Sequence, residues 1–142
     1  MSNQIPLDEI RRLAISHLFA RKAQEVSWLD LRDRSTLCDC YVLATCTTEM
    51  QLQSMLSGVR RDLSKAGVTS LGSEADPGAR WGVLDFGNVI VHLFLRDARD
   101  HYALERLWQD APQHEAKAAD YPVPDAPDLE EESEPVSGEA WE

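Results

Sequence analysis

An apolar run followed at once by a capped helix constrains the fold more than any other part of this chain. Residues 39–46 read D-C-Y-V-L-A-T-C, a length and composition typical of a buried β-strand. Thr48 stands three residues before Gln51, the spacing of a capping box, and apolar residues then recur at helical spacing as far as Leu63. Gly67 is a helix-ending glycine. A strand joined directly to an amphipathic helix predicts helices layered on a sheet.

The other segments extend this pattern along the chain. We expect a helix over 7–22, a strand over 25–31, a loop over 68–80, strands over 81–85 and 89–95, and a last helix from an Asp97 N-cap to Trp108. The sequence therefore predicts a single compact α/β domain over residues 1–111, with a mixed β-sheet flanked by helices.

Acidity is concentrated at the C-terminal end. The net charge is −11, and residues 109–142 hold 11 acids against one lysine, so the rest of the chain is close to neutral. Prolines interrupt this acidic stretch and few apolar residues accompany them, which predicts a disordered tail over 112–142. Trp141 within it is either a docking anchor or an isolated exposed aromatic residue. The near-neutral remainder predicts little direct nucleic-acid binding.

The sequence offers no sign of a membrane or an oxidising compartment. Three cysteines do not suggest a disulfide framework. No apolar run approaches the roughly 20 residues of a membrane span, and charged residues interrupt the N-terminal apolar stretch where a signal peptide would need its core. We therefore expect a cytoplasmic protein with no membrane association.

The tripeptide Asp85-Phe86-Gly87 matches the metal-binding signature of protein kinases. The accompanying glycine-rich loop, strand lysine and H-R-D loop do not precede it, so the kinase interpretation fails. Asp85 is better interpreted as the end of a strand, bonded to nearby backbone amides, with Gly87 supplying the positive φ of a tight turn.

Metal or nucleophilic chemistry has weak support elsewhere in the chain. Cys38, Cys40 and Cys46 share one face of the expected strand, where small buried cysteines are commoner than a soft-metal site. His92 alternates with apolar neighbours on a strand and is expected to be half-buried and hydrogen-bonded, with no nucleophile beside it. We predict no catalytic, cofactor-binding or metal-binding residues.

Two further hypotheses remain open from the residues themselves. Asp39 and Asp85 could lie close across a sheet as in a nucleotidyltransferase, although the glycine-serine turn and Asp-x-Asp pair of such enzymes are not found. Large aromatic residues near arginines could instead anchor a protein interface, with Trp81 expected to be exposed. The residues concerned are Trp81, Tyr102 and Trp108, with Arg80, Arg99 and Arg106.

Four strings together resemble the Iojap-like ribosomal silencing factor family, in order and over roughly residues 5–110. They are D-L-R-D-R-S-T-L-C-D-C-Y-V-L-A-T-C-T-T (30–48), G-V-T-S-L-G-S-E (67–74), W-G-V-L-D-F-G-N-V-I-V-H-L-F (81–94) and R-D-H-Y-A-L-E-R-L-W (99–108). The resemblance implies a nucleotidyltransferase-like fold without catalytic residues. It also implies a factor that binds the large ribosomal subunit through its protein L14 and sterically blocks joining of the small subunit, so that translation falls when nutrients are scarce.

The resemblance carries over to particular residues as well. It implies that Trp81 contacts the ribosomal partner, and it places Asp85, His92, Arg99 and Tyr102 on positions that the family shares. Glu74-Ala75 stands where the family has an acidic-glycine pair, and the acidic tail is not explained by the family pattern. Family members are often homodimers when free. An assembly factor acting on immature large subunits is an alternative that the sequence does not separate from silencing.

Overall fold

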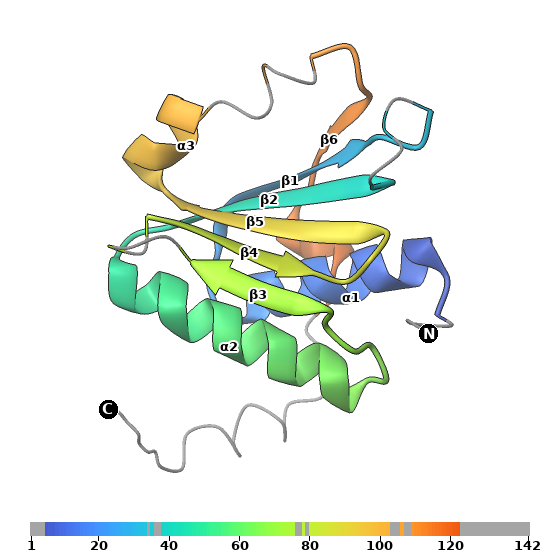
Figure 1. The fold of residues 1–142 in the computed structure, drawn as a ribbon, viewed down its shortest axis with the longest axis horizontal. Coiled ribbons are helices and arrows are strands. Elements are labelled where there is room, and N and C mark those ends of the chain that lie inside the picture. Colours follow the sequence, from blue (N-terminus) through green and yellow to red (C-terminus); the bar gives the residue numbers. More distant parts are fainter. Residues whose placement is uncertain are drawn as a thin grey trace.

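A six-stranded mixed sheet forms the centre of the molecule (Figure 1). It is seen in a computed structural model that describes residues 5–33, 35, 38–75, 78, 80–102, 106 and 109–122. Chain order is α1 Leu7–Ala20, β1 Gln24–Asp30, β2 Cys40–Cys46, α2 Glu49–Lys65, β3 Gly72–Ala75, β4 Trp81–Asp85, β5 Val89–Leu95, α3 Arg96–Tyr102, β6 Gln113–Glu115 and the 3-10 helix η1 Ala118–Asp120.

The strands lie in the order β3-β4-β5-β2-β1-β6. The central pair, β2 and β5, is parallel, and every other neighbouring pair is antiparallel. The predicted α/β class with a mixed sheet flanked by helices is therefore confirmed.

Helix α2 has the ends that its sequence predicts. The Thr48 hydroxyl accepts a hydrogen bond from the Gln51 backbone amide at 3.0 Å, while the Gln51 side chain returns to the Thr47 amide at 2.7 Å. At the other end Gly67 has φ +95°, and the amide of Val68 bonds to the Leu63 carbonyl at 2.8 Å. This is a Schellman motif, in which a left-handed glycine lets the chain turn back and satisfy the last carbonyls.

Each face of the sheet carries its own apolar cluster. The larger cluster lies between the sheet and the helices α1 and α2, which both cover the same face (Figure 1). The smaller one lies on the opposite face, where α3 packs, and consists of Leu29, Leu31, Leu43, Phe94, Ala98 and Ala111, with Tyr41, Trp81 and Leu95 packed against it. One face is thus covered by two long helices, while the described residues that pack on the other include Ala98 of the short helix α3 and Ala111.

Two strands form where the sequence predicted none. Gly72–Ala75, expected to be part of a loop, forms the edge strand β3, and Gln113–Glu115, expected in the disordered tail, forms β6 at the other edge. Both are short, polar and mostly exposed, so they carry no apolar alternation. Backbone pairing with β4 determines the conformation of β3, and pairing with β1 determines that of β6. This pairing outweighs the weak strand preference of their own residues.

The folded chain consequently continues past residue 111, to at least residue 122. Trp28 of β1 stacks on His114 with ring centroids 4.2 Å apart. The Arg11 guanidinium lies over the same Trp28 ring, 4.0 Å from its centroid. Tyr121 contacts Phe19 of α1 at 6.2 Å between ring centroids. Residues 123–142, the rest of the predicted tail, lie outside the described residues.

The last helix also differs from expectation. It begins at Arg96, so Asp97 lies inside its first turn and pairs with Arg80 at 2.9 Å, and does not cap it. The predicted continuation to Trp108 falls mostly on residues that are not described. Among the described residues, no helix has the length and apolar character needed to cross a bilayer.

A buried ionic cluster joins the two long helices. Asp62 of α2, with a side chain 2% exposed, accepts hydrogen bonds from Arg21 Nε at 2.9 Å and Arg21 Nη2 at 3.0 Å, and His17 Nδ1 lies 3.1 Å away. Gly58 makes room for this contact, because a Cβ atom there would lie 2.3 Å from the Arg21 guanidinium carbon. The bidentate geometry compensates the cost of desolvating both charges.

We predict that Asp62→Ala lowers the free energy of unfolding by about 3–5 kcal/mol, because it leaves the Arg21 guanidinium buried without its counter-charge. Urea denaturation at neutral pH measures the change. Asp97→Ala is the matched control: its ion pair with Arg80 is exposed, with 70% of the aspartate side chain accessible, and its loss should cost at most ~1 kcal/mol. Equal losses in the two variants would contradict the structural role of the buried cluster.

Candidate protein-binding face

The candidate site is the sheet face opposite α1 and α2. On β4 and β5 the side chains alternate, and the register pairs Trp81 with Phe94, Val83 with His92 and Asp85 with Ile90 across the two strands. The intervening Gly82 faces α2, since a Cβ atom there would lie 2.7 Å from a methyl carbon of Leu56. The six paired side chains therefore point away from the long helices. We call this surface the strand face; it comprises Tyr41, Glu74, Trp81, Val83, Asp85, Ile90, His92 and Phe94.

Four rings pack together at the centre of the strand face. Trp81 stacks on Phe94 at 5.6 Å and on His92 at 5.9 Å between ring centroids, and Tyr41 meets His92 edge-on at 4.5 Å. Phe94 and His92 are buried, while Trp81 and Tyr41 are half-buried. Trp81 is thus less exposed than the sequence suggested, because it lies flat on its neighbours. These residues, Tyr41, Trp81, His92 and Phe94, form what we call the aromatic cluster.

His92 is held in one neutral form within this cluster. Its Nδ1 accepts a hydrogen bond from Trp81 Nε1–H at 3.2 Å, which places the imidazole proton on Nε2. The side chain is 6% exposed, and this burial lowers the pKa of His92 to about 4. The expected hydrogen bond of this strand histidine is confirmed, although the ring is buried and not half-buried as expected, and it is uncharged at neutral pH.

Asp85 ends β4 in the way that its sequence context predicts. Its Oδ1 accepts a hydrogen bond from the Gly87 backbone amide at 2.8 Å, and Gly87 has φ +95° in the turn to β5. Glu74 lies on the edge strand β3, paired in register with Val83, and is exposed. Glu74 and Asp85 line a shallow pocket of about 330 Å³ beside this edge. The strand face is therefore acidic at one side of its aromatic cluster.

Arg99 has a different role from the one expected of it. Its guanidinium donates to the Thr45 hydroxyl at 2.9 Å, to the Ser27 hydroxyl at 3.1 Å and to the Glu25 carbonyl, so it fastens α3 to β1 and β2. Tyr102 is the last residue of α3, and its side chain lies outside the described residues. The structure thus brings Trp81, Asp85, Glu74 and His92 together on one face and uses Arg99 to position the neighbouring helix.

The three cysteines are buried packing residues in the described chain. Cys40 and Cys46 lie in the large core beneath the helices, where burial raises their thiol pKa values to about 12 and about 11. Cys38 is also buried, its pKa is raised by the same cause, and its thiol donates to the Cys40 carbonyl at 3.0 Å. The described residues contain no group of three side chains able to hold a metal ion.

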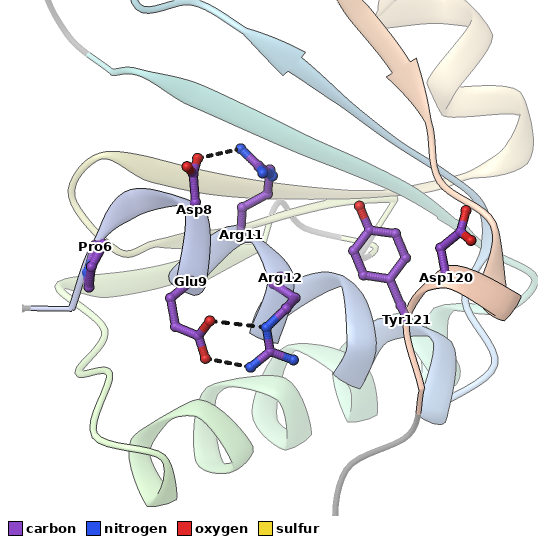
Figure 2. Close-up of a pocket in the computed structure, with 7 residues that line it drawn as sticks. All are labelled: Pro6, Asp8, Glu9, Arg11, Arg12, Asp120 and Tyr121. Atoms are coloured by element: carbon purple, nitrogen blue, oxygen red, sulfur yellow. Dashed lines mark hydrogen bonds and ion pairs between the residues drawn. The ribbon is translucent and has the colours of Figure 1, made fainter.

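A second pocket lies on the helix side of the molecule. It has a volume of about 540 Å³ and is formed between the start of α1 and the end of the described chain, as Figure 2 shows. Both guanidinium groups in it are paired along α1, Arg11 with Asp8 at 2.9 Å and Arg12 with Glu9. Their positive charge is therefore neutralised locally, and the pocket does not favour an anion.

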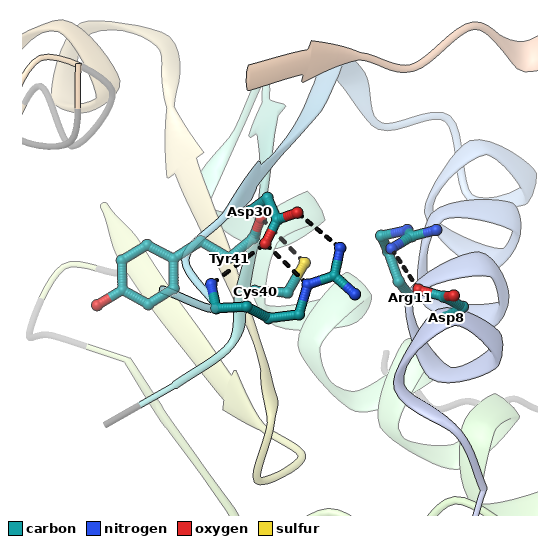
Figure 3. A network of polar contacts seen from close by, with 6 residues as sticks. Asp8, Arg11, Asp30, Cys40 and Tyr41 are labelled. Carbon is teal, nitrogen blue, oxygen red and sulfur yellow. Dashed lines mark hydrogen bonds and ion pairs between the residues drawn. The ribbon is translucent and has the colours of Figure 1, made fainter. Parts of the chain in front are cut away.

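The polar contacts around Asp30 form a local ion pair at the end of β1. Asp30 accepts hydrogen bonds from Arg32 Nε at 2.9 Å and Nη2 at 2.6 Å, which lowers the pKa of the carboxyl to about 2. Figure 3 places this carboxyl near Cys40 and on the sheet, apart from the Asp8–Arg11 pair on α1. The contact is local in sequence and partly exposed, as expected of a surface ion pair that orients a strand end.

Sequence reasoning missed the contribution of β2 to the strand face. Tyr41 belongs to an apolar strand whose cysteines share one face, and period-two alternation places Tyr41, Leu43 and Thr45 on the other face. The pairing Tyr41 with Ile90 and Leu43 with His92 then brings Tyr41 to the aromatic cluster. The alternation was a usable signal, whereas the partner strand was not readable from spacing.

Fold and site together define a class of protein: a mixed α/β domain whose candidate functional residues form an aromatic surface on one face of the sheet. Comparison with known proteins gives the family. The family described as "Ribosomal silencing factor during starvation" matches residues 5–140, so the match continues through the acidic tail that the resemblance left unexplained. The chain belongs to this ribosomal silencing factor family.

Relatives and solved structures agree with that assignment. A protein of Halalkalibacterium halodurans named ribosomal silencing factor RsfS is 33% identical over 112 residues, which span 79% of this chain and 92% of the relative. A relative of the same name from Haemophilus influenzae is 36% identical over 87 residues, 61% of this chain and 85% of its own. A crystal structure of a Chromobacterium violaceum protein is 32% identical, with a TM-score of 0.71 over 81% of this chain and 97% of the other.

The pKa of His92 gives a prediction about stability at acid pH. Because its pKa is near 4 in the folded chain and 6.5 when unperturbed, the unfolded state binds the extra proton between these values. The contribution of neutral His92 to the free energy of unfolding is therefore fully present above pH 6.5 and is lost as the pH falls toward 4.

At about pH 4.5 the titration of His92 should lower the free energy of unfolding by roughly 2–3 kcal/mol relative to its value at pH 7. His92→Asn keeps an acceptor for Trp81 and cannot titrate, so its unfolding free energy should fall by correspondingly less over the same interval. Urea denaturation of both proteins at the two pH values measures the difference. Parallel pH profiles would show that His92 does not titrate as a buried neutral group.

Proposed function

We propose that this protein is a ribosomal silencing factor that acts as a cytoplasmic steric block. It binds the large ribosomal subunit through ribosomal protein L14 and prevents the small subunit from joining, which represses translation when nutrients are limiting. The carrying observation is the aromatic cluster on a sheet face that neither long helix of the described residues covers, in a chain of the silencing-factor family. Occlusion requires a firm contact surface and no reaction.

Several properties of the strand face suit a protein partner. Half-buried aromatic side chains fixed by packing are the usual anchors of protein interfaces, because little side-chain entropy is lost when they bind. Trp81 is fixed in this way by Phe94 and by its hydrogen bond to His92. Residues on paired strands hold their geometry better than residues on loops. We assign partner contact to Trp81, Asp85, Glu74 and His92, with Arg99 and Tyr102 acting through α3 beside them.

Charge favours a basic protein surface over RNA as the direct contact. Glu74 and Asp85 lie on the strand face, and His92 is neutral, so a phosphate backbone would meet negative charge there. Described arginines near α3 are already engaged, Arg96 with Glu25 at 2.8 Å and Arg80 with Asp97. The acids of the strand face instead complement lysines or arginines of a ribosomal protein.

The same strand face is available to a second copy of the chain. We propose that the free protein is a homodimer, as the family resemblance implies. Sedimentation velocity of the purified chain, with and without isolated L14 protein, tests this. A dimer that gives way to a one-to-one complex indicates that the two partners share a surface, and a monomer at all concentrations contradicts the dimer.

Sucrose-gradient sedimentation tests the main proposal. Purified large and small subunits are mixed with and without the protein under conditions that favour association. We expect the protein to comigrate with the large subunit and the subunits to stay apart. Normal joining with the protein at the top of the gradient would refute the proposal. Comigration without any effect on joining would favour the assembly role, and accumulated large-subunit precursors in depleted cells would support it.

We predict that Trp81→Ala weakens binding to the large subunit by at least ~2 kcal/mol, about 30-fold, because it removes a central anchor. The variant also loses packing on Phe94, so binding is measured well below its unfolding temperature, with circular dichroism as a check. Met50→Ala is the control: this side chain is 81% exposed on α2, away from the strand face, and its loss should leave affinity unchanged. Unchanged affinity of Trp81→Ala would remove the strand face from the interface.

A further inference from the structure

One buried donor on the strand face has no acceptor among the described residues. Because Trp81 occupies Nδ1 of His92, the proton lies on Nε2, and this N–H has no hydrogen-bond partner among the residues that the structure describes. Only 6% of the His92 surface is exposed. Leaving a buried donor unpaired costs free energy in the folded chain, and such groups are uncommon in native proteins. A position that carries this cost calls for an explanation.

The other unpaired buried atoms lie elsewhere in the described chain. Arg11 Nε belongs to a guanidinium that lies over the Trp28 ring and bonds to Asp8, and Ser16 Oγ lies on the buried side of α1. Neither is on the strand face. His92 alone of the three stands at the centre of the aromatic cluster, beside Trp81 and opposite Val83.

We propose that the Nε2–H of His92 is a binding contact that donates a hydrogen bond to a neutral acceptor oxygen of the protein partner, a backbone carbonyl, side-chain amide or hydroxyl. This inference rests on the proposed function, because it assigns a specific contact to the same face. The unpaired donor then becomes satisfied only in the complex, which makes it a determinant of specificity: a partner surface without an acceptor at that point leaves the donor buried and unpaired.

The electrostatics of the face select a neutral acceptor. The charged groups of the strand face are the acids Glu74 and Asp85, which would repel a carboxylate or phosphate that approached the histidine. The imidazole does not offset this by taking up a proton, since burial keeps its pKa near 4. A neutral oxygen avoids the repulsion and still accepts the hydrogen bond.

Access to Nε2 requires one neighbour to move. Tyr41 is the half-exposed ring that meets the imidazole edge-on at 4.5 Å, and it comes from β2, whose backbone is fixed by pairing on both sides. Rotation of Tyr41, the partly exposed neighbour, is the movement that we propose uncovers the imidazole, since the backbone of β2 can stay paired while the side chain turns. Phe94, also in contact with the imidazole, is fully buried and cannot move in this way.

Two substitutions at the same position separate a contact from a supporting role. His92→Gln places an amide donor near the position of Nε2 and gives up the acceptor for Trp81. His92→Asn places an amide oxygen near the position of Nδ1, which keeps the bond to Trp81, and gives up the donor. Affinity for purified large ribosomal subunits is measured for the wild-type chain and both variants, after thermal unfolding confirms that each is folded.

We expect His92→Gln to bind within about threefold of the wild-type chain and His92→Asn to bind about tenfold more weakly, the usual effect of one lost hydrogen bond at an interface. Binding of His92→Asn as tight as that of His92→Gln, or tighter, overturns the inference, because His92 would then act only by orienting Trp81. Failure of the wild-type chain to bind is a different result, since it refutes the proposed function.

A measurement on the unmodified protein covers the case in which a variant does not fold. In proton–nitrogen spectra tuned to histidine side chains, the Nε2–H resonance of His92 should move downfield and exchange more slowly when isolated ribosomal protein L14 is added. An Nε2–H resonance unchanged in a complex whose formation is evident from other residues overturns the inference.

Discussion

The parallel pairing of β2 with β5 is the constraint on which the rest of the structure depends. Seven residue pairs hold it in register, from Cys40 with Val89 to Cys46 with Leu95. Parallel neighbours cannot be joined by a tight turn, so the chain leaves the sheet after β2 and returns only at β5. Helix α2 makes that crossing over one face, and β3 and β4 are added to the edge on the way back. The helices and the strand face follow from this one pairing.

The two faces of the sheet consequently differ in kind. The helix face is packed so closely that Gly82 has no room for a methyl group beside Leu52 and Leu56. On the opposite face Trp81 and Tyr41 remain partly accessible, and they stand on paired strands and pack on the buried rings of His92 and Phe94. The side chains on this face therefore have their positions set before any contact, which would keep the ordering cost of binding there low.

The sequence predicts the periodic parts of this architecture and misses what depends on distant pairing. The capped helix α2 and the strands β4 and β5 are predictable because their apolar spacing and end signals are strong. The polar strands β3 and β6 are not, because their backbone partners determine them and their own side chains do not. The same holds for the site: Trp81 and His92 are visible in the sequence, but the contact of Tyr41 with His92 joins residues 51 positions apart. Arg99 is equally instructive, since sequence alone cannot tell an interface arginine from one that reaches back to β1.

The ends of the described chain meet on the helix side. Pro6 and Tyr121 line the same pocket, and Tyr121 packs on Phe19 of α1. Start and finish are thus neighbours, and both lie on the face turned away from the aromatic cluster. The described part of the chain can therefore be joined to other sequences at residue 6 or residue 121, or inserted between them into a loop of another protein, on the face away from the aromatic cluster. A circular permutant that joins residues 6 and 121 through a short linker should accordingly keep the same strand face.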